Sequence, residues 1–388
     1  REESRMSRSS DVLVVGGGAI GGALAWALAR RGLTVTMVEA GRIGRGASWA
    51  AAGVLAPDWS AETPPALAVL AADSLALWPD WLAELEERAE TRLNFRKDGL
   101  LHLWVDPGAP HLPPDLTVAP PPLGAGSSRR LDADEVRALE PALTGPIAGA
   151  ILSPDDAQVD NPRLAPALIR AATALGMRVR TEAPVLALLG SGGRCTGVRT
   201  ARGDAIAAGA VILAAGAWSG PLAAASGLSL PMEPWRGQML AFDAVARPLR
   251  HIVSCGELVL VPRPHGPLVV GTTLEEVGFD ARATLAGLHQ ILARAARIVP
   301  GLGDLPLVRA WAGLRPGTPD LLPYLGPVPG WEGLFAATGH GRKGIILAPI
   351  TGELMARLIL ENDLDPRLIP CLPSRVAASD PAETDRGR

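Results

Sequence analysis

Lysine is almost absent from this chain of 388 residues. Lys97 and Lys343 are its only lysines, so nearly all of the 37 basic residues are arginines. A genome-wide composition bias explains such a preference, and it makes each remaining lysine worth locating. The formal net charge of −3 provides no general attraction to nucleic acid or to an anionic membrane. We therefore expect no nucleic-acid partner.

Cysteine is scarce as well. Cys195, Cys255 and Cys371 form no C-x-x-C pair and have no metal-ligand spacing, so we expect no metal site. Their odd number and wide separation suit free thiols in a reducing compartment. We therefore expect a cytoplasmic protein without disulfide bonds.

Long uninterrupted apolar runs are also missing. The longest uncharged run, residues 205–232, contains several glycines and prolines, which favours a strand, a turn and a loop over a membrane-spanning helix. Residues 1–10 are polar and basic and contain no apolar segment, so we expect no signal peptide there. Insertion into a membrane is not expected.

The first clear pattern is a β-α-β unit near the N-terminus. Apolar strands are predicted at 12–16 and 34–39. Between them Ile20, Leu24 and Leu28 recur every four residues, as on the buried face of a helix. Such a unit is typical of α/β proteins with a parallel sheet.

Further segments follow along the chain, whose length suits two domains. Residues 107–130 are rich in proline and glycine and are expected to lack fixed secondary structure. Strands are predicted at 100–105, 184–189, 195–200, 210–215, 238–243, 258–262 and 267–272, and helices at 65–88, 162–175, 282–298 and 345–361.

The strands after position 235 suggest a mostly antiparallel sheet inserted between pieces of the first domain. We therefore predict an α/β fold, with a Rossmann-type nucleotide-binding domain and an interleaved α+β substrate domain. The nucleotide-binding domain is expected at 11–57, 150–225 and 325–362, the substrate domain at 58–149 and 226–324, and flexible termini at 1–10 and 373–388.

A dinucleotide fingerprint, G-x-G-x-x-G, connects the first strand to the first helix. Gly16 permits the tight turn, Gly18 lets a pyrophosphate approach the backbone, and Gly21 allows close packing of helix on strand. Ala19 and Ile20 begin the helix, whose free N–H groups can bind phosphates. Glu39 ends the second strand, where its carboxylate can accept hydrogen bonds from ribose hydroxyls.

A run of small residues follows this unit. It suits either a tightly packed loop or backbone lying against a flat ring system, and the residues alone leave both interpretations open. The candidate cofactor-binding residues here are Ala47, Ser48, Ala51, Ala52, Gly53 and Val54.

Four stretches together resemble the glycine oxidase and D-amino-acid oxidase family of FAD enzymes. They are 12–57, the A-V-I-L-A-A-G-A-W run at 210–218, the W-A-G-L-R-P-G-T-P-D run at 311–320, and residues 339–349. The last two are more specific than the glycine-rich fingerprint. The resemblance extends over about 11–362 and implies FAD as the cofactor.

The family resemblance also implies further contacts to FAD. A helix beginning near Gly344 would direct its positive N-terminal end at the flavin, where reduced flavin carries negative charge. No cysteine lies near the 311–320 motif, so we expect FAD to bind non-covalently. The additional residues expected at FAD are Ala215, Gly216, Trp218, Gly237, Gln238, Gly341, Arg342, Gly344 and Ile345.

A substrate amino acid needs a clamp for its carboxylate. Arg315 matches the family's substrate-binding arginine, because a planar guanidinium can hold a carboxylate through two parallel bonds. Arg342 matches a second arginine beside the pocket, or faces solvent. Lys343, which stands where the family usually has asparagine, either joins the site or is exposed. For His340 a supporting role is favoured over that of a base.

The family's glycine oxidases usually have a tyrosine at the position of Val259, so we expect a wider pocket that lacks one hydroxyl donor. The resemblance implies oxidation of glycine or another small amino acid, with hydride passing from the substrate α-carbon to flavin N5 and O2 forming H2O2. Thiamine biosynthesis is the implied pathway. Two alternatives remain open: a dehydrogenase for D-amino acids or sarcosine that passes electrons to a carrier, and a structural flavoprotein without turnover. A homo-oligomer is possible.

Overall fold

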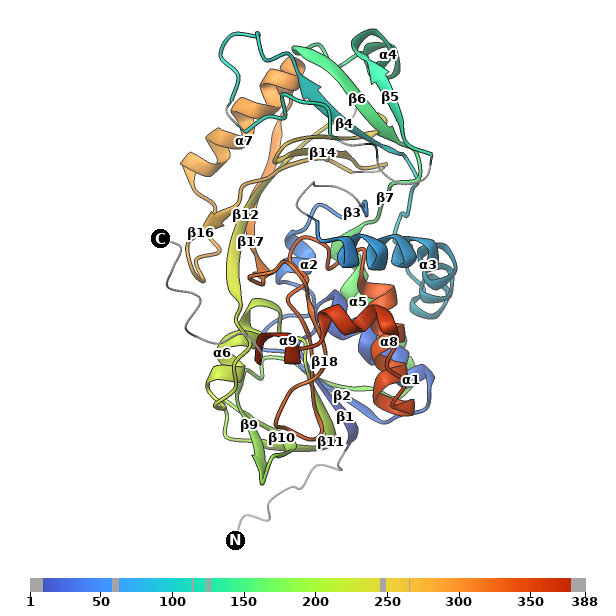
Figure 1. Cartoon of the computed structure of the whole chain (residues 1–388), viewed down its shortest axis with the longest axis vertical. Helices are drawn as coiled ribbons and strands as arrows, with labels where there is room; N and C mark the ends of the chain where they lie inside the picture. The colour runs from blue at the N-terminus through green and yellow to red at the C-terminus, as the bar shows by residue number, and fades with distance from the viewer. Residues whose placement is uncertain are drawn as a thin grey trace.

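The computed structural model describes residues 10–57, 63–113, 115–121, 123, 127–244, 249–264 and 266–377. Two large sheets organise the molecule, one in the lower and one in the upper half of Figure 1, and the long strands β12 (Glu233–Phe242) and β17 (Leu307–Gly317) run between the two halves. Most of residues 1–10, all of 378–388 and parts of 107–130, for which we predicted flexible termini or an irregular segment, lie outside the described residues.

The lower sheet has a parallel centre. In its order β19-β11-β1-β2-β8 all neighbouring strands are parallel. Their bounds are Leu334–Thr338, Ala205–Leu213, Ser10–Val15, Val35–Val38 and Arg178–Arg180. Antiparallel strands extend this sheet: β18 (Tyr324–Pro327) pairs with β19, and the ribbon of β9 (Val185–Ser191) and β10 (Arg194–Thr200) pairs with β11.

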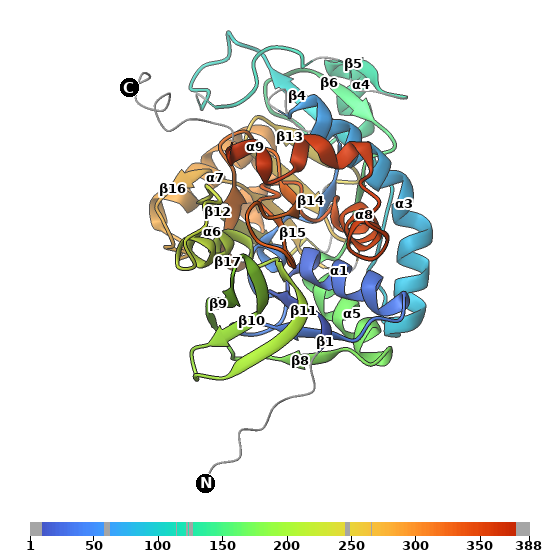
Figure 2. The ribbon, with the colours of Figure 1, turned by 60° about the horizontal axis from the view of Figure 1, so that its bottom comes forward.

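Successive side chains of β1 point to opposite faces of the lower sheet, and each face is covered by its own hydrophobic core. Val12 and Val14 point into a core shared with several helices, whereas Leu13 and Val15 point into a core on the opposite face. Figure 2 shows the helices gathered along one side of the sheet. They are α1 (Ala19–Arg30), α5 (Asn161–Ala174), α8 (Ala348–Glu361) and the long α3 (Pro65–Ala89).

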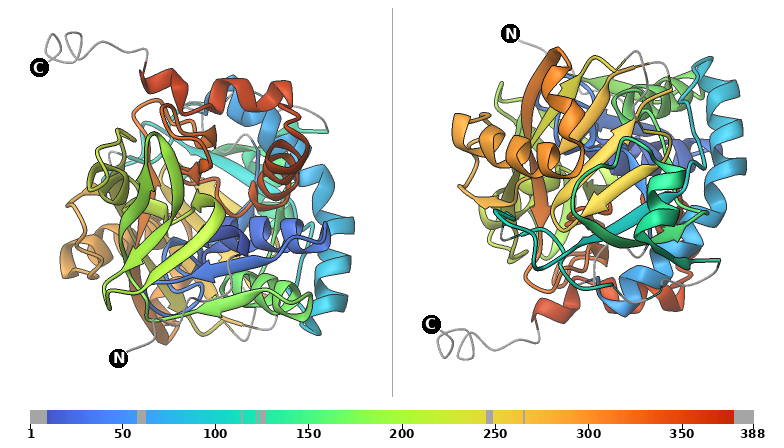
Figure 3. Two further views of the ribbon diagram at one scale, coloured as in Figure 1. Left: turned by 90° about the horizontal axis from the view of Figure 1, so that it is seen from below. Right: turned by 90° about the horizontal axis from the view of Figure 1, so that it is seen from above.

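α3 is long and apolar enough to cross a membrane by length and composition alone. It contains Pro79, and it buries Leu70, Trp78 and Trp81 in the core that covers the lower sheet. Both panels of Figure 3 show it lying along the side of the molecule. Because its apolar side is used for packing, we interpret α3 as a core helix.

The upper sheet is mostly antiparallel. Its order is β16-β12-β15-β14-β13-β4-β6-β5, with β17 paired to β12; only the contact between β13 and β4 is parallel. Its remaining strands are β4 (Leu100–Val105), β5 (Arg129–Asp132), β6 (Ile147–Ser153), β13 (Ile252–Cys255), β14 (Leu258–Pro262), β15 (Leu268–Gly271) and β16 (Glu275–Glu276).

The two faces of the upper sheet have different neighbours. Leu258 and Leu260 face α7 (Leu285–Ile298), which crosses the outer face in the right-hand panel of Figure 3. Val259 and Val261 face the other way and pack with residues that follow the nucleotide-binding unit. The period-2 alternation of β14 therefore directs Val259 toward the interior between the two sheets.

The fold class predicted from the sequence is confirmed. The strand predicted at 210–215 is longer, because β11 begins at Ala205. β17 was not predicted as a strand, although it carries Arg315. Two shorter helices, α4 (Ala133–Leu139) and α6 (Ser219–Ala224), and the small antiparallel sheet of β3 (Val54–Leu55) with β7 (Ala157–Gln158) were also missed.

The strand pairing suggests two adjustments to the proposed domain limits. β6 belongs to the upper sheet, so we place the return to the lower domain after Ser153 instead of at 150. Residues 373–377, which we assigned to a flexible tail, include the short helix α9 (Ser374–Ala377). Arg375 there pairs with Asp320 and lies over the ring of Tyr324.

Candidate active site

A cavity of about 710 Å³ lies between the two sheets. The lower side is formed by the ends of β1 and β2, the start of α1 and the small-residue segment that includes α2 (Ala47–Ala50). The upper side is formed by β12, β14 and β17. The cavity is thus shaped by the two units that the sequence predicted as nucleotide-binding and substrate domains.

The nucleotide end is built for close backbone approach. Gly16 has a φ of +113°, and a Cβ there would collide with the carbonyl of Ala214. A Cβ on Gly21 would collide with the carbonyl of Gly16, so this glycine allows α1 to pack directly on the turn. Gly18 precedes the helix as its N-cap and provides no side chain, which leaves first-turn N–H groups directed at the cavity.

Two side chains complete this end. The Glu39 carboxylate accepts hydrogen bonds from the backbone N–H groups of Gly17 (2.7 Å) and Gly41 (2.9 Å), and these bonds hold it at the cavity wall. Ser48 Oγ accepts a bond of 2.9 Å from the N–H of Ala19 and so joins α2 to the start of α1. The arrangement suits a dinucleotide, with Glu39 as the ribose acceptor and the helix start as the phosphate site.

Most of the predicted site residues line this one cavity. The exceptions are Gly21, which packs α1 on the turn as described above, and Gln238 and Lys343, which are described below. The predicted residues that line the cavity are Gly16, Gly18, Ala19, Ile20, Glu39, Ala47, Ser48, Ala51, Ala52, Gly53, Val54, Ala215, Gly216, Trp218, Gly237, Val259, Arg315, Gly341, Arg342, Gly344 and Ile345.

Arg315 projects from β17 into the upper part of the cavity. Its guanidinium donates to Thr272 Oγ1 (2.7 Å) and to the carbonyl of Thr273 (3.1 Å). Gly237 on β12 makes room for it, because a Cβ there would collide with the guanidinium. The cavity leaves the side chain partly accessible, yet the surrounding protein, together with the charge of Arg342, lowers the pKa of Arg315 to about 10.

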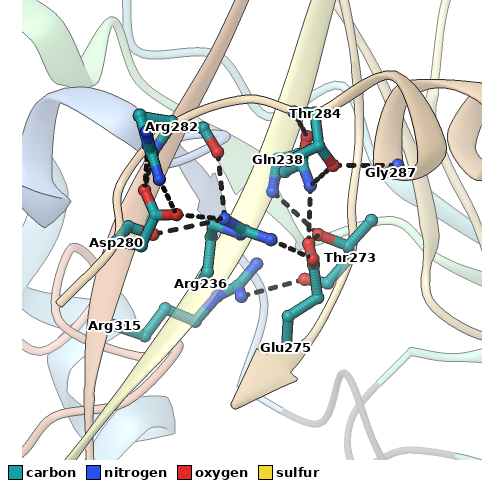
Figure 4. Close-up of polar contacts among 9 residues, drawn as sticks. All are labelled: Arg236, Gln238, Thr273, Glu275, Asp280, Arg282, Thr284, Gly287 and Arg315. Carbon is teal, nitrogen blue, oxygen red and sulfur yellow. Dashed lines mark hydrogen bonds and ion pairs between the residues drawn. The ribbon is translucent and has the colours of Figure 1, made fainter. Parts of the chain in front are cut away.

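Within the described residues, Arg315 makes no ion pair with a carboxylate, and Figure 4 shows why Glu275, an acidic side chain of the same sheet, does not supply one. Glu275 pairs with Arg236 (2.5 Å) and accepts hydrogen bonds from Thr273 Oγ1 (2.5 Å) and Gln238 Nε2 (2.7 Å). Burial raises the pKa of Glu275, but these donors outweigh burial and keep it below its usual value. Glu275 is therefore already engaged, and the Arg315 cation is left for a ligand.

Arg342 is the second arginine at this end. Its guanidinium is paired with both carboxylate oxygens of Glu257 at 2.8 Å, and both side chains are about 30% exposed. Arg342 thus lines the cavity, and its guanidinium is only partly exposed to solvent. Its charge is matched by a protein carboxylate, whereas that of Arg315 is not.

Two predicted residues lie elsewhere. The side chain of Gln238 points away from the cavity toward the start of α7, where Nε2 donates to Thr284 Oγ1 (3.0 Å) and Oε1 accepts from the N–H of Thr284 (2.7 Å). Lys343 is neither exposed nor among the residues that line the cavity: it is 7% exposed, and Nζ donates to the carbonyls of Ala56 and Pro57, both at 2.8 Å. Because successive residues of β12 point to opposite faces of the sheet, Gly237 faces the cavity and Gln238 faces away from it. Lys343 is kept from the cavity by its hydrogen bonds to two backbone carbonyls.

The C-terminal loop supports the cavity from below. Gly344 and Ile345 line the cavity, but α8 begins at Ala348, later than predicted, after turns through residues 344–347. His340 is 3% exposed, and its Nε2 lies 3.2 Å from Thr351 Oγ1. Burial lowers the pKa of His340 to about 3, so the ring is neutral near pH 7 and unsuited to serve as a base.

Thr272 and Glu257 were missed by sequence reasoning. Thr272 directly follows β15 and holds Arg315, while Glu257 lies in the turn between β13 and β14 and holds Arg342. Their partners are distant in the sequence, so no local spacing could have indicated them.

The chain matches the protein family described as FAD dependent oxidoreductase (DAO) over residues 11–358. A glycine oxidase from Pseudomonas aeruginosa is 37% identical over 354 residues, which cover 90% of this chain and 95% of the relative. A bifunctional protein ThiO/ThiG from Synechocystis is 35% identical over 377 residues, which cover 95% of this chain and 54% of the relative. The crystal structure of glycine oxidase from Geobacillus kaustophilus has a TM-score of 0.85 and 34% identity, covering 95% of this chain and 99% of that chain.

The fold and the cavity therefore define an oxidoreductase that binds an adenine dinucleotide. The chain belongs to the DAO family of FAD-dependent oxidoreductases, and it is an FAD-dependent amino-acid oxidase similar to glycine oxidases. Its residues fit the cofactor: Gly16 leaves a cradle that a Cβ would fill, the start of α1 presents N–H groups, and Glu39 is held at the ribose position.

FAD should be released when the protein is denatured. Cys195, Cys255 and Cys371 are buried, and none is among the residues that line the described cavity, so no thiol is placed to form a covalent link. After acid precipitation and centrifugation, we expect the flavin in the supernatant, identified as FAD by chromatography. Flavin that stays with the precipitated chain would contradict this prediction.

Proposed function

We propose that this protein oxidises glycine or another small amino acid to the imino acid, with O2 as electron acceptor and H2O2 as the second product. FAD, held by the start of α1 and by Glu39, would supply the acceptor for a hydride from the substrate α-carbon. The protein contributes mainly position: Arg315 holds the carboxylate, and the wall formed by Gly237 and Val259 leaves room for a small substrate.

The observation that supports this proposal most is that Arg315 has no carboxylate partner among the described residues. A guanidinium enclosed by the protein is costly without a counter-charge, and Arg315 has only two neutral acceptors among the described residues. A substrate carboxylate would supply the missing charge and occupy the planar fork. A flavoprotein with a purely structural role would not need such a group beside the cofactor cavity.

The direct test is anaerobic mixing of the purified holoprotein with glycine, sarcosine, D-alanine and D-proline. We expect loss of the oxidised flavin absorbance with at least one of them, followed by O2 uptake and H2O2 formation when air is admitted. Flavin reduction without O2 uptake, together with reduction of an artificial dye, would instead support a dehydrogenase. If no small amino acid bleaches the flavin, the proposed activity is wrong.

Val259 should set the substrate preference. It is 1% exposed and lies opposite Gly271 on the cavity face of the sheet, so a larger side chain there would extend into the cavity. Without a tyrosine hydroxyl, glycine loses one hydrogen bond to its carboxylate, which corresponds to about 10- to 150-fold in affinity. We therefore expect a high KM for glycine, with sarcosine or D-alanine used comparably well or better.

Val259→Tyr should shift kcat/KM toward glycine, and Val259→Phe is the matched control because it adds the ring without the hydroxyl. The measurement is kcat/KM for glycine, sarcosine and D-alanine in all three proteins. If the natural protein already prefers glycine strongly and Val259→Tyr leaves that preference unchanged, Val259 does not contact the substrate.

We also propose that the imino acid enters thiamine-thiazole biosynthesis, as the similarity to glycine oxidases implies. Loss of the gene should then create a growth requirement that the thiazole moiety satisfies. Growth without thiazole at the normal rate would contradict this role.

A further inference from the structure

The charges at the upper end of the cavity do not balance. Arg315 contributes one positive charge, and the paired Arg342 and Glu257 contribute none in sum. Of the ionisable residues at this end, where Gly237, Met239, Val259 and Thr272 form the wall, only Arg315 has no charged partner within the described residues. A ligand with one negative charge neutralises this end of the cavity, and a ligand with two does not.

Glu257 lies close enough to Arg315 for the two charges to interact, because its carboxylate opposes the lowering of the Arg315 pKa by burial. Its backbone carbonyl accepts a hydrogen bond of 3.1 Å from the N–H of Thr272, and Thr272 Oγ1 accepts from Arg315 at 2.7 Å. The same residue thus borders the carboxylate clamp through its backbone and holds Arg342 through its side chain.

The Glu257 carboxylate has two effects on a second anionic group. Both of its oxygens accept from Nη2 of Arg342, so this nitrogen is engaged and the positive charge of the guanidinium is already paired. It also cancels the attraction that the Arg342 cation would otherwise exert on that group, and its own negative charge opposes the approach of a second anion.

We infer that Glu257 restricts the substrate to amino acids with a single anionic group, because it holds Arg342 and leaves Arg315 as the one cation available to a substrate. This inference deepens the proposed function and rests on it for the identity of the substrate. Sarcosine and iminodiacetate are a matched pair for testing it, since both are N-substituted glycines and iminodiacetate carries the additional carboxylate.

The first measurement is binding, which does not require turnover. Acetate and malonate are titrated into the holoprotein, and their dissociation constants are read from the change in flavin absorbance. Glu257→Gln should tighten malonate binding by about tenfold while acetate changes by less than about threefold, because one repulsive charge is removed and Arg342 is released. The double variant Glu257→Gln, Arg342→Gln should lose this gain.

Glu332→Gln is the control for the loss of one negative charge, since Glu332 is 73% exposed and is not among the residues that line the cavity. It should leave both dissociation constants unchanged. If Glu257→Gln does not fold, Arg342→Gln tests the same inference. It leaves Glu257 unpaired and should weaken malonate binding about tenfold more than acetate binding.

The second measurement is the ratio of kcat/KM for iminodiacetate to that for sarcosine, which should rise by about tenfold in Glu257→Gln. The inference is wrong if the protein oxidises sarcosine but Glu257→Gln changes neither the relative affinity for malonate and acetate nor the relative kcat/KM for iminodiacetate and sarcosine. It is also wrong if Glu332→Gln changes these quantities as Glu257→Gln does. If no amine is oxidised and the malonate effect is nevertheless present, the proposed oxidase activity fails and the role of Glu257 stands.

Discussion

Arg315→Ala should leave FAD bound and reduce kcat/KM for the best substrate by about 100-fold or more, because it removes the charge-assisted pairing and the alignment of the substrate together. Arg315→Lys should recover only part of the loss, since an ammonium group cannot form the two parallel bonds of a guanidinium. The measurement is steady-state oxidation, with flavin content determined from absorbance for each variant.

Arg309→Ala is the matched control. Arg309 lies earlier on the same strand, is exposed, and contacts the ring of Trp49, away from Thr272 and Thr273. We expect its kcat/KM to remain close to that of the natural protein. Near-normal turnover by Arg315→Ala would show that the substrate carboxylate is bound elsewhere in the cavity, and Arg342 would be the next residue to test.

Glu39→Lys should yield a protein that is purified largely without flavin. The substitution removes the acceptor for the ribose hydroxyls, and it leaves the N–H groups of Gly17 and Gly41 without their partner. Each hydrogen bond to a charged group contributes about 1.5–3 kcal/mol, so we expect the dissociation constant for FAD to rise about 100-fold or more. Titration of the apoprotein with FAD, followed by flavin fluorescence, measures this change.

Glu39→Gln separates the charge from the hydrogen bond, because the amide keeps one acceptor oxygen. It should bind FAD with an affinity between those of the natural protein and Glu39→Lys. A Glu39→Lys variant that retains FAD after extensive dialysis, with an unchanged thermal midpoint, would show that Glu39 does not contact the ribose.

The sequence was informative where residues that act together lie close together in the chain. The β1–α1–β2 unit combines period-2 strands, helical spacing and a glycine turn within a few dozen residues, and its fold followed from these signals. Arg315 and Val259 were found by motif, and both line the cavity. β17 was harder to recognise, because its pairing with the distant strand β12 determines its conformation.

Side-chain direction was the main source of error. Gly237 and Gln238 are neighbours, yet strand alternation directs only one of them to the cavity. Lys343 and Arg342 are also neighbours, and their different partners, two backbone carbonyls and the Glu257 carboxylate, come from distant segments. A motif alone cannot distinguish such adjacent positions, because tertiary contacts decide which one reaches the ligand.

Arg263, which follows β14 of the upper sheet, bonds to segments around β7 and the start of α5. Its guanidinium donates to the carbonyls of Ala52 (2.7 Å) and Val159 (2.6 Å) and to the side chains of Asn161 (2.9 Å) and Gln158 (3.2 Å). Separating the two halves would exchange these four charge-assisted hydrogen bonds for bonds to water, at a cost of about 1.5–3 kcal/mol each. The consequence is thermodynamic cooperativity: the two halves should melt in one transition, with equal calorimetric and van't Hoff enthalpies, although each has its own sheet.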